Sequence, residues 1–153
     1  MQARKIEEAM RLVREHGARV TRPRVRVLAE LLAAGQALTH LDVQRRVERA
    51  EAVDRVDRVT LYRVLDWLVE IGLAHRVAGP DRVFRFSVQA PGHGAHGHFR
   101  CTRCERMFCM RESAGLGRLV RSILPDRFTE EAIELTVSGC CAECAGTRRE
   151  NPR

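Results

Sequence analysis

The chain has 153 residues, of which 44% are hydrophobic, and no apolar run in it is long enough to cross a membrane. Its formal net charge is +7, from 27 lysine and arginine against 20 aspartate and glutamate side chains, an excess that suits a polyanionic partner. Met1 is followed by a charged, amphipathic segment rather than the apolar core of a secretion signal. These features exclude a membrane protein and favour a cytoplasmic one, in which cysteine thiols stay reduced.

Three amphipathic helices are predicted near the N-terminus. The first spans residues 4–16, where apolar side chains recur at helical spacing. The second begins after Thr21, a residue type that favours the N-cap, and stops at Gly35. The third follows Thr39, with Asp42 placed three residues later as in a capping box.

A fourth helix and a hairpin follow. The helix is predicted over residues 58–71, with an apolar stripe on one face and Gly72 as its stop. Two strands, at 73–77 and 82–87, flank a turn-rich segment at 78–81. Helices followed by a two-stranded hairpin are the order of a winged helix-turn-helix, in which the helix before the hairpin enters the DNA major groove. Double-stranded DNA is therefore the expected partner.

A hinge rich in Gly and Pro, at residues 89–95, separates this domain from a second one. The second domain is predicted to contain strands at 99–100 and 107–110, a helix at 116–123 and a strand at 133–137. The expected fold class is α+β. It consists of a winged helix-turn-helix DNA-binding domain over 1–87 and a small α+β dimerisation and metal-binding domain over 88–153.

Two cysteine knuckles lie in the second domain, Cys101-x-x-Cys104 and Cys141-x-x-Cys144. Together they supply the four thiolates of a tetrahedral structural zinc site, and reduced thiols at this spacing favour a metal over a disulfide. A domain this small buries a marginal core, so a structural metal or a partner subunit is expected. Cys140 competes with its neighbour, but the x-x spacing favours Cys141.

Further candidate ligands surround the first knuckle. His93, His96 and His98 precede it and Cys109 follows it. A thiolate at Cys109 moves metal preference from iron or manganese toward zinc, although an ordinary buried cysteine is the alternative. The three histidines also suggest a hydrolytic zinc enzyme, but the chain contains no His-Glu-x-x-His or comparable motif that bears a general base. No enzymatic activity is expected.

Arginine and tyrosine side chains mark the expected DNA surface of the first domain. Tyr62 and Arg63 lie early on the fourth helix, where recognition helices present side chains to base edges. A second group flanks the start of the second helix, whose free N–H groups favour a phosphate. This group is Arg19, Arg22 and Arg24. The weaker candidates are Arg58, Arg82 and Arg85. Half-buried packing of Tyr62 and solvated charge at the arginines are the alternatives.

Five short motifs occur along the chain in an order that is specific as a set. They are Arg19-x-Thr21-x-x-Arg24, Thr60-Leu-Tyr62-Arg63-x-Leu65-x-x-Leu68, Gly72-Leu73, His96-x-His98-x-x-Cys101-x-x-Cys104 and Gly139-x-Cys141-x-x-Cys144. With them the chain resembles the ferric uptake regulator (Fur) superfamily of bacterial metal- and peroxide-sensing repressors over almost its full length. The resemblance implies an N-terminal DNA-binding domain, a C-terminal dimerisation domain and a regulatory metal at the hinge. It also assigns Tyr62 and Arg63 to DNA contact.

The chain departs from the family pattern at several regulatory positions. Ala37 replaces a histidine that often opens the third helix, although His40 lies one turn on, and Ser87 replaces a carboxylate after the second wing strand. Cys109 stands where peroxide sensors carry an acidic ligand and zinc sensors often carry Glu. His75 occupies the position at which zinc-sensing (Zur) members carry a ligand, with an exposed strand histidine as the alternative.

The resulting prediction is a homodimeric, zinc-responsive transcriptional repressor of the Zur type that binds palindromic operator DNA of metal-uptake genes. One structural Zn²⁺ and one regulatory Zn²⁺ are its expected cofactors. The alternative keeps the repressor but changes its signal to iron, manganese, nickel, haem or peroxide.

Overall fold

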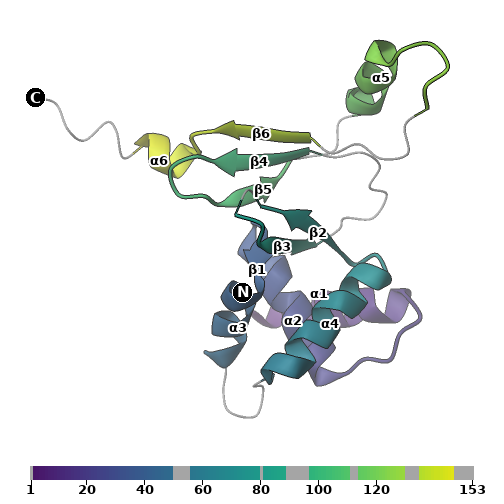
Figure 1. The fold of residues 1–153 in the computed structure, drawn as a ribbon. Coiled ribbons are helices and arrows are strands. Elements are labelled where there is room, and N and C mark those ends of the chain that lie inside the picture. Colours follow the sequence, from purple (N-terminus) through teal and green to yellow (C-terminus); the bar gives the residue numbers. More distant parts are fainter. Residues whose placement is uncertain are drawn as a thin grey trace, which may run out of the picture. The chain divides into compact units, whose positions relative to one another are not determined.

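The computed structural model describes residues 2–49, 56–79, 81–88, 97–110, 114–129 and 135–146. The chain divides into two compact units, Met1–Ala90 and Pro91–Arg153, which we describe one at a time (Figure 1). Within the described ranges, no helix combines the length and the hydropathy needed to cross a membrane.

The described residues of the first unit include four helices, and the sequence predicts all of them. They are α1 (Gln2–Glu15), α2 (Arg22–Ala34), α3 (His40–Glu48) and α4 (Arg58–Glu70). Their apolar faces meet in one core, whose largest fully buried side chains include Leu28, Leu38, Leu61, Leu65, Leu68 and Phe86. Burying each such side chain stabilises the fold by roughly 1.5–3 kcal/mol. The core therefore holds α4, the expected recognition helix, against α2 and α3.

Local hydrogen bonds set where these helices begin and end. The Thr39 side chain accepts a hydrogen bond from the backbone N–H of Asp42 at 3.1 Å, and the Asp42 carboxylate accepts one from the backbone N–H of Thr39 at 3.0 Å. This is the predicted capping box, of a kind that contributes roughly 1 kcal/mol. Asp57 caps α4 with a single hydrogen bond, accepting from the backbone N–H of Thr60 at 3.0 Å. Gly35, at φ +62°, ends α2 in the left-handed conformation that glycine tolerates.

The wing is a three-stranded antiparallel sheet rather than the hairpin predicted from the sequence. Strands β2 (Ala74–Ala78) and β3 (Phe84–Val88) form the expected hairpin, and β1 (Leu38–Thr39) adds to the free edge of β3. Phe86 is fully buried in the helical core, which ties the sheet to the helices. The turn of the hairpin is closed by a bidentate ion pair, in which Arg85 donates to Asp81 at 2.8 and 2.9 Å.

The described residues of the second unit form a mixed sheet and two helices. Its strands are β4 (Gly97–Cys101), β5 (Met107–Cys109) and β6 (Leu135–Gly139), and its helices are α5 (Ala114–Ile123) and α6 (Ala142–Gly146). Strand β4 lies in the middle, antiparallel to β5 and parallel to β6. Of the residues described in this unit, the buried hydrophobic side chains are those of Cys101, Met107 and Cys141. So small an apolar core fits a unit that depends on a metal for its stability.

Candidate metal centre and DNA-binding surface

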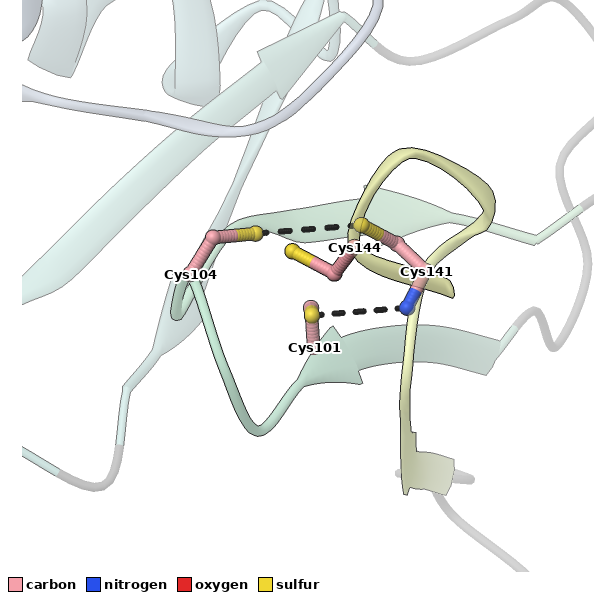
Figure 2. A group of neighbouring side chains, drawn as sticks. All are labelled: Cys101, Cys104, Cys141 and Cys144. Carbon is pink, nitrogen blue, oxygen red and sulfur yellow. Dashed lines mark hydrogen bonds between the residues drawn. The ribbon is translucent and has the colours of Figure 1, made fainter. Parts of the chain in front are cut away.

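Four cysteines from the two ends of the second unit form one cluster. Cys101 ends β4 and Cys104 lies in the turn after it, whereas Cys141 and Cys144 lie at α6. Figure 2 shows their sulfur atoms directed toward one another, and all four Sγ atoms lie within 4.8 Å of each other. A tetrahedral zinc ion with Zn–S distances of about 2.3 Å places its sulfurs about 3.8 Å apart. The Sγ atoms of Cys104 and Cys141 are 3.8 Å apart, so the donor set fits such an ion.

The parallel pairing of β4 with β6 brings the two knuckles together. Cys101 is the register partner of Gly139, and the backbone N–H of Thr102 extends the ladder by donating to the Gly139 carbonyl at 2.8 Å. The second knuckle begins two residues after Gly139. Glu105, at φ +57°, gives the first knuckle its tight turn. Backbone hydrogen bonds between β4 and β6 therefore bring the two pairs of sulfur atoms close together without the help of an ion.

The electrostatics of the cluster favour a cation at its centre. Backbone N–H groups of Cys104 and Cys141 lower the pKa of Cys101 to about 5. The side chain of Cys141, together with burial, raises the pKa of Cys144 to about 12. Four close sulfurs cannot all ionise without a compensating charge, and a divalent ion supplies it. Metal binding at this site must therefore release protons and weaken as pH falls.

Cys140 lies outside the four-cysteine group. Its thiol is exposed and donates to the backbone carbonyl of Cys141 at 3.7 Å. Of the two adjacent cysteines, Cys141 joins the cluster, and it is the one separated from Cys144 by two residues, as the knuckle spacing predicts.

A second pair of candidate ligands faces across β4 and β5. His98 and Cys109 are register partners, and their ligand atoms lie within 4.8 Å of each other. An imidazole and a thiolate at this separation suit one ion, which needs further ligands to complete its coordination. His75 is half-buried on β2 of the first unit, as the register partner of Ser87. The other candidates, His93 and His96, lie outside the described residues.

The start of α4 presents the side chains expected to meet DNA. Arg58 and Arg63 are exposed, and Tyr62 is 37% exposed. The Tyr62 ring stacks on His40 with 4.1 Å between ring centroids, and the guanidinium carbon of Arg58 lies 5.7 Å from the centroid of the Tyr62 ring. Burial lowers the pKa of His40, which favours the neutral ring in this stack. The stack restrains Tyr62 while leaving part of its side chain exposed.

The other arginine candidates divide into exposed and engaged side chains. Arg19 and Arg22 are exposed. Arg24 instead lies over the Trp67 ring at 3.8 Å from its centroid and donates to the Arg19 carbonyl at 2.8 Å, so its guanidinium helps to pack α2 against α4. Arg85, one of the weaker candidates, is buried and paired with Asp81, whereas Arg82 is exposed.

Sequence reasoning missed Arg106. This guanidinium contacts the four-cysteine cluster, and its only sequence signal is its position two residues after Cys104. The contact depends on how the knuckles fold together, which spacing alone does not reveal.

Comparison with known proteins identifies the family. Residues 15–124 match the model of the ferric uptake regulator family. The chain belongs to the Fur family. It is accordingly a metal-responsive transcription regulator that binds DNA, and members of this family are not enzymes. Its second unit contains a four-cysteine site of the type that holds structural zinc.

Solved structures support the fold assignment. A zinc uptake regulator complexed with zinc and DNA is 21% identical (TM-score 0.73; 97% of this chain and 98% of that chain covered). The ferric uptake regulator of Vibrio cholerae is 19% identical (TM-score 0.65; 86% and 98% covered). That of Pseudomonas aeruginosa with manganese is 25% identical (TM-score 0.63; 88% and 98% covered). No curated protein sequence matches the chain. The Fur-family fold is thus shared with regulators of different metals.

Proposed function

We propose that this Fur-family regulator is a homodimeric, zinc-responsive repressor of the Zur type that binds palindromic operator DNA of metal-uptake genes in the cytoplasm. The observation that carries the choice of metal is the pairing of Cys109 with His98 on neighbouring strands. The four-cysteine site supports a structural role for a second zinc ion, but does not bear on the metal that is sensed.

The chemistry of the pair favours zinc. A thiolate is a soft ligand that zinc binds well, whereas manganese prefers oxygen ligands in an octahedral arrangement. Serine at position 87 likewise offers no carboxylate. On the resemblance to zinc sensors we propose His75 as a further ligand, with His96 or His93 completing the set. The similarity to a zinc uptake regulator bound to zinc and DNA agrees with this choice.

Exposed apolar side chains in the second unit support a dimer. Leu119 and Ile123 of α5 are 60% and 73% exposed, and Phe128 is 67% exposed. Large apolar side chains gathered in one small unit are typical of a surface that is covered by a partner subunit. A twofold dimer also accounts for a palindromic operator, because each half-site meets the same protein surface.

A metal series tests the proposed signal. Operator duplexes selected from random sequence are titrated with protein that retains its structural zinc, in buffers that set the free concentration of Zn²⁺, Mn²⁺, Fe²⁺ or Ni²⁺. We expect zinc to stimulate DNA binding at the lowest free concentration, because one ligand is a thiolate. Equal or stronger stimulation by iron or manganese, or a response only to peroxide or haem, contradicts the zinc assignment and leaves DNA binding intact.

The role of α4 is tested by Arg63→Ala. If Arg63 reads a base edge, the variant should lose roughly 1–3 kcal/mol of affinity for the operator and relax specificity at one position of each half-site. If it holds a phosphate, affinity should fall alike on all sequences and the salt dependence should become shallower. Arg14→Ala, which removes an exposed arginine from α1, is the charge-matched control. Operator binding by Arg63→Ala that equals the control removes this side chain from the interface.

A further inference from the structure

Arg106 contacts sulfur atoms of both cysteine knuckles. Its Nε donates to Cys104 Sγ at 3.2 Å, and its Nη2 donates to Cys141 Sγ at 3.7 Å. The same Nη2 forms an ion pair with the Glu143 carboxylate, and the guanidinium lies 5.6 Å from the centroid of the Phe108 ring. One half-buried side chain from the first knuckle thus reaches two of the four candidate ligands.

The position of Glu143 makes this contact a connection between the knuckles. Glu143 lies inside the second knuckle, between Cys141 and Cys144, and its carboxylate is the acceptor that holds the Arg106 guanidinium. The side chain of Glu143 is 73% exposed, so the ion pair by itself contributes little to stability. The ion pair matters for geometry, because it holds the Arg106 guanidinium where its Nε and Nη2 donate to the sulfur atoms of Cys104 and Cys141.

The charge of the site explains why such a contact matters. Four thiolates around one divalent ion carry a net charge of −2, and N–H groups that donate to thiolates withdraw electron density from the sulfurs. Partners of this kind orient the ligands and tune the metal, and their loss typically lowers metal affinity by 10–100-fold.

We propose that Arg106, held by Glu143, is a positioning residue of the four-cysteine zinc site that raises its zinc affinity and lowers the electron density on Cys104 and Cys141. The inference concerns the structural site and does not depend on which metal the regulator senses. It adds a fifth side chain to the machinery of the site, one that touches the ligands rather than the ion.

Arg103 provides a matched control. Its Nη1 also reaches from the first knuckle to the second, where it donates to the backbone carbonyl of Cys144 at 2.9 Å. The structure shows this arginine bonded to a carbonyl oxygen, whereas Arg106 is bonded to sulfur. Replacing either with glutamine removes one positive charge and one connection between the knuckles, and the change at Arg106 also removes the sulfur contacts.

The first measurement is the zinc affinity of the full-length chain, by competition with a chelator. Arg106→Gln should weaken zinc binding by about 10–100-fold, and Arg106→Lys and Glu143→Gln should lie between it and the parent. Arg103→Gln should remain close to the parent. Equal losses for Arg106→Gln and Arg103→Gln would overturn the proposal, because the sulfur contacts would then contribute nothing specific.

The second measurement is the absorption of the cobalt-substituted protein, which reports on the sulfurs themselves. Removing a donor from a thiolate raises its electron density, so the sulfur-to-cobalt charge-transfer band should move to longer wavelength in Arg106→Gln and stay in place in Arg103→Gln. The d–d bands show whether the site remains tetrahedral. If Arg106→Gln does not fold, Arg106→Lys and Glu143→Gln decide the matter, and an unmoved charge-transfer band in both overturns the proposal.

Discussion

Replacing Cys101 or Cys144 with serine should release the structural zinc ion and unfold the second unit. The binding free energy of a structural zinc ion, about 10–16 kcal/mol in small zinc domains, is also folding free energy. The described part of this unit has almost no apolar core to take its place. We expect zinc content to fall by one ion per chain, and residues 88–144 to become susceptible to proteolysis while the helical unit stays protected.

Cys140→Ser is the matched control for this experiment. It removes a thiol adjacent to the cluster without removing a sulfur from the four-cysteine group. This variant should keep its zinc and its protease resistance. A folded chain that retains tightly bound zinc after Cys101→Ser or Cys144→Ser would show that the four cysteines do not form the structural site.

Cys109→Ser should leave the structural zinc in place and abolish the stimulation of DNA binding by zinc. A serine hydroxyl is a poor ligand for zinc at neutral pH, so the regulatory ion is lost while the four-cysteine cluster is untouched. Coupling of about 1–3 kcal/mol between metal and DNA corresponds to roughly 5–150-fold in affinity, and this is the gain that should disappear. Operator affinity with and without added zinc, beside the zinc content of each variant, measures it.

Two further variants are compared with Cys109→Ser. His75→Ala should behave like Cys109→Ser if His75 is a ligand as the resemblance to zinc sensors implies, and Cys140→Ser should respond to zinc as the parent does. Because imidazole and thiolate ligands bind metal only when deprotonated, the stimulation in the parent should weaken as pH falls through the histidine range at about 6.5. A Cys109→Ser variant that still responds to zinc as the parent does would make Cys109 an ordinary surface thiol.

Features with a local physical cause could be predicted from the sequence. The capping box at Thr39 and the end of the second helix at Gly35 depend on a few neighbouring residues, and both are confirmed. The elements that were missed are short. Strand β1 has two residues, too few to show alternation, and α6 has five, too few to show a helical period. Both are held by contacts that arise only when the fold is complete.

In the candidate sites, too, local patterns could be predicted from the sequence and long-range contacts could not. Spacing alone identified the four-cysteine cluster, because a Cys-x-x-Cys knuckle imposes its own geometry. The pairing of His98 with Cys109 depends on the register of two strands, which no pattern in their few residues determines. Arg24 matches a motif expected at DNA, yet its guanidinium lies over Trp67, a residue 43 positions away in the sequence. Long-range contacts of this kind decide what an arginine does.

The measurement that tests zinc responsiveness most directly is the affinity of the regulatory site for zinc in the presence and absence of operator DNA. The chain should carry its structural zinc throughout, so that only the second ion is titrated. Because coupling between two ligands is reciprocal, a zinc ion that promotes DNA binding must itself bind more tightly when DNA is present, by roughly 5–150-fold. Equal zinc affinities with and without operator would contradict a zinc-controlled repressor.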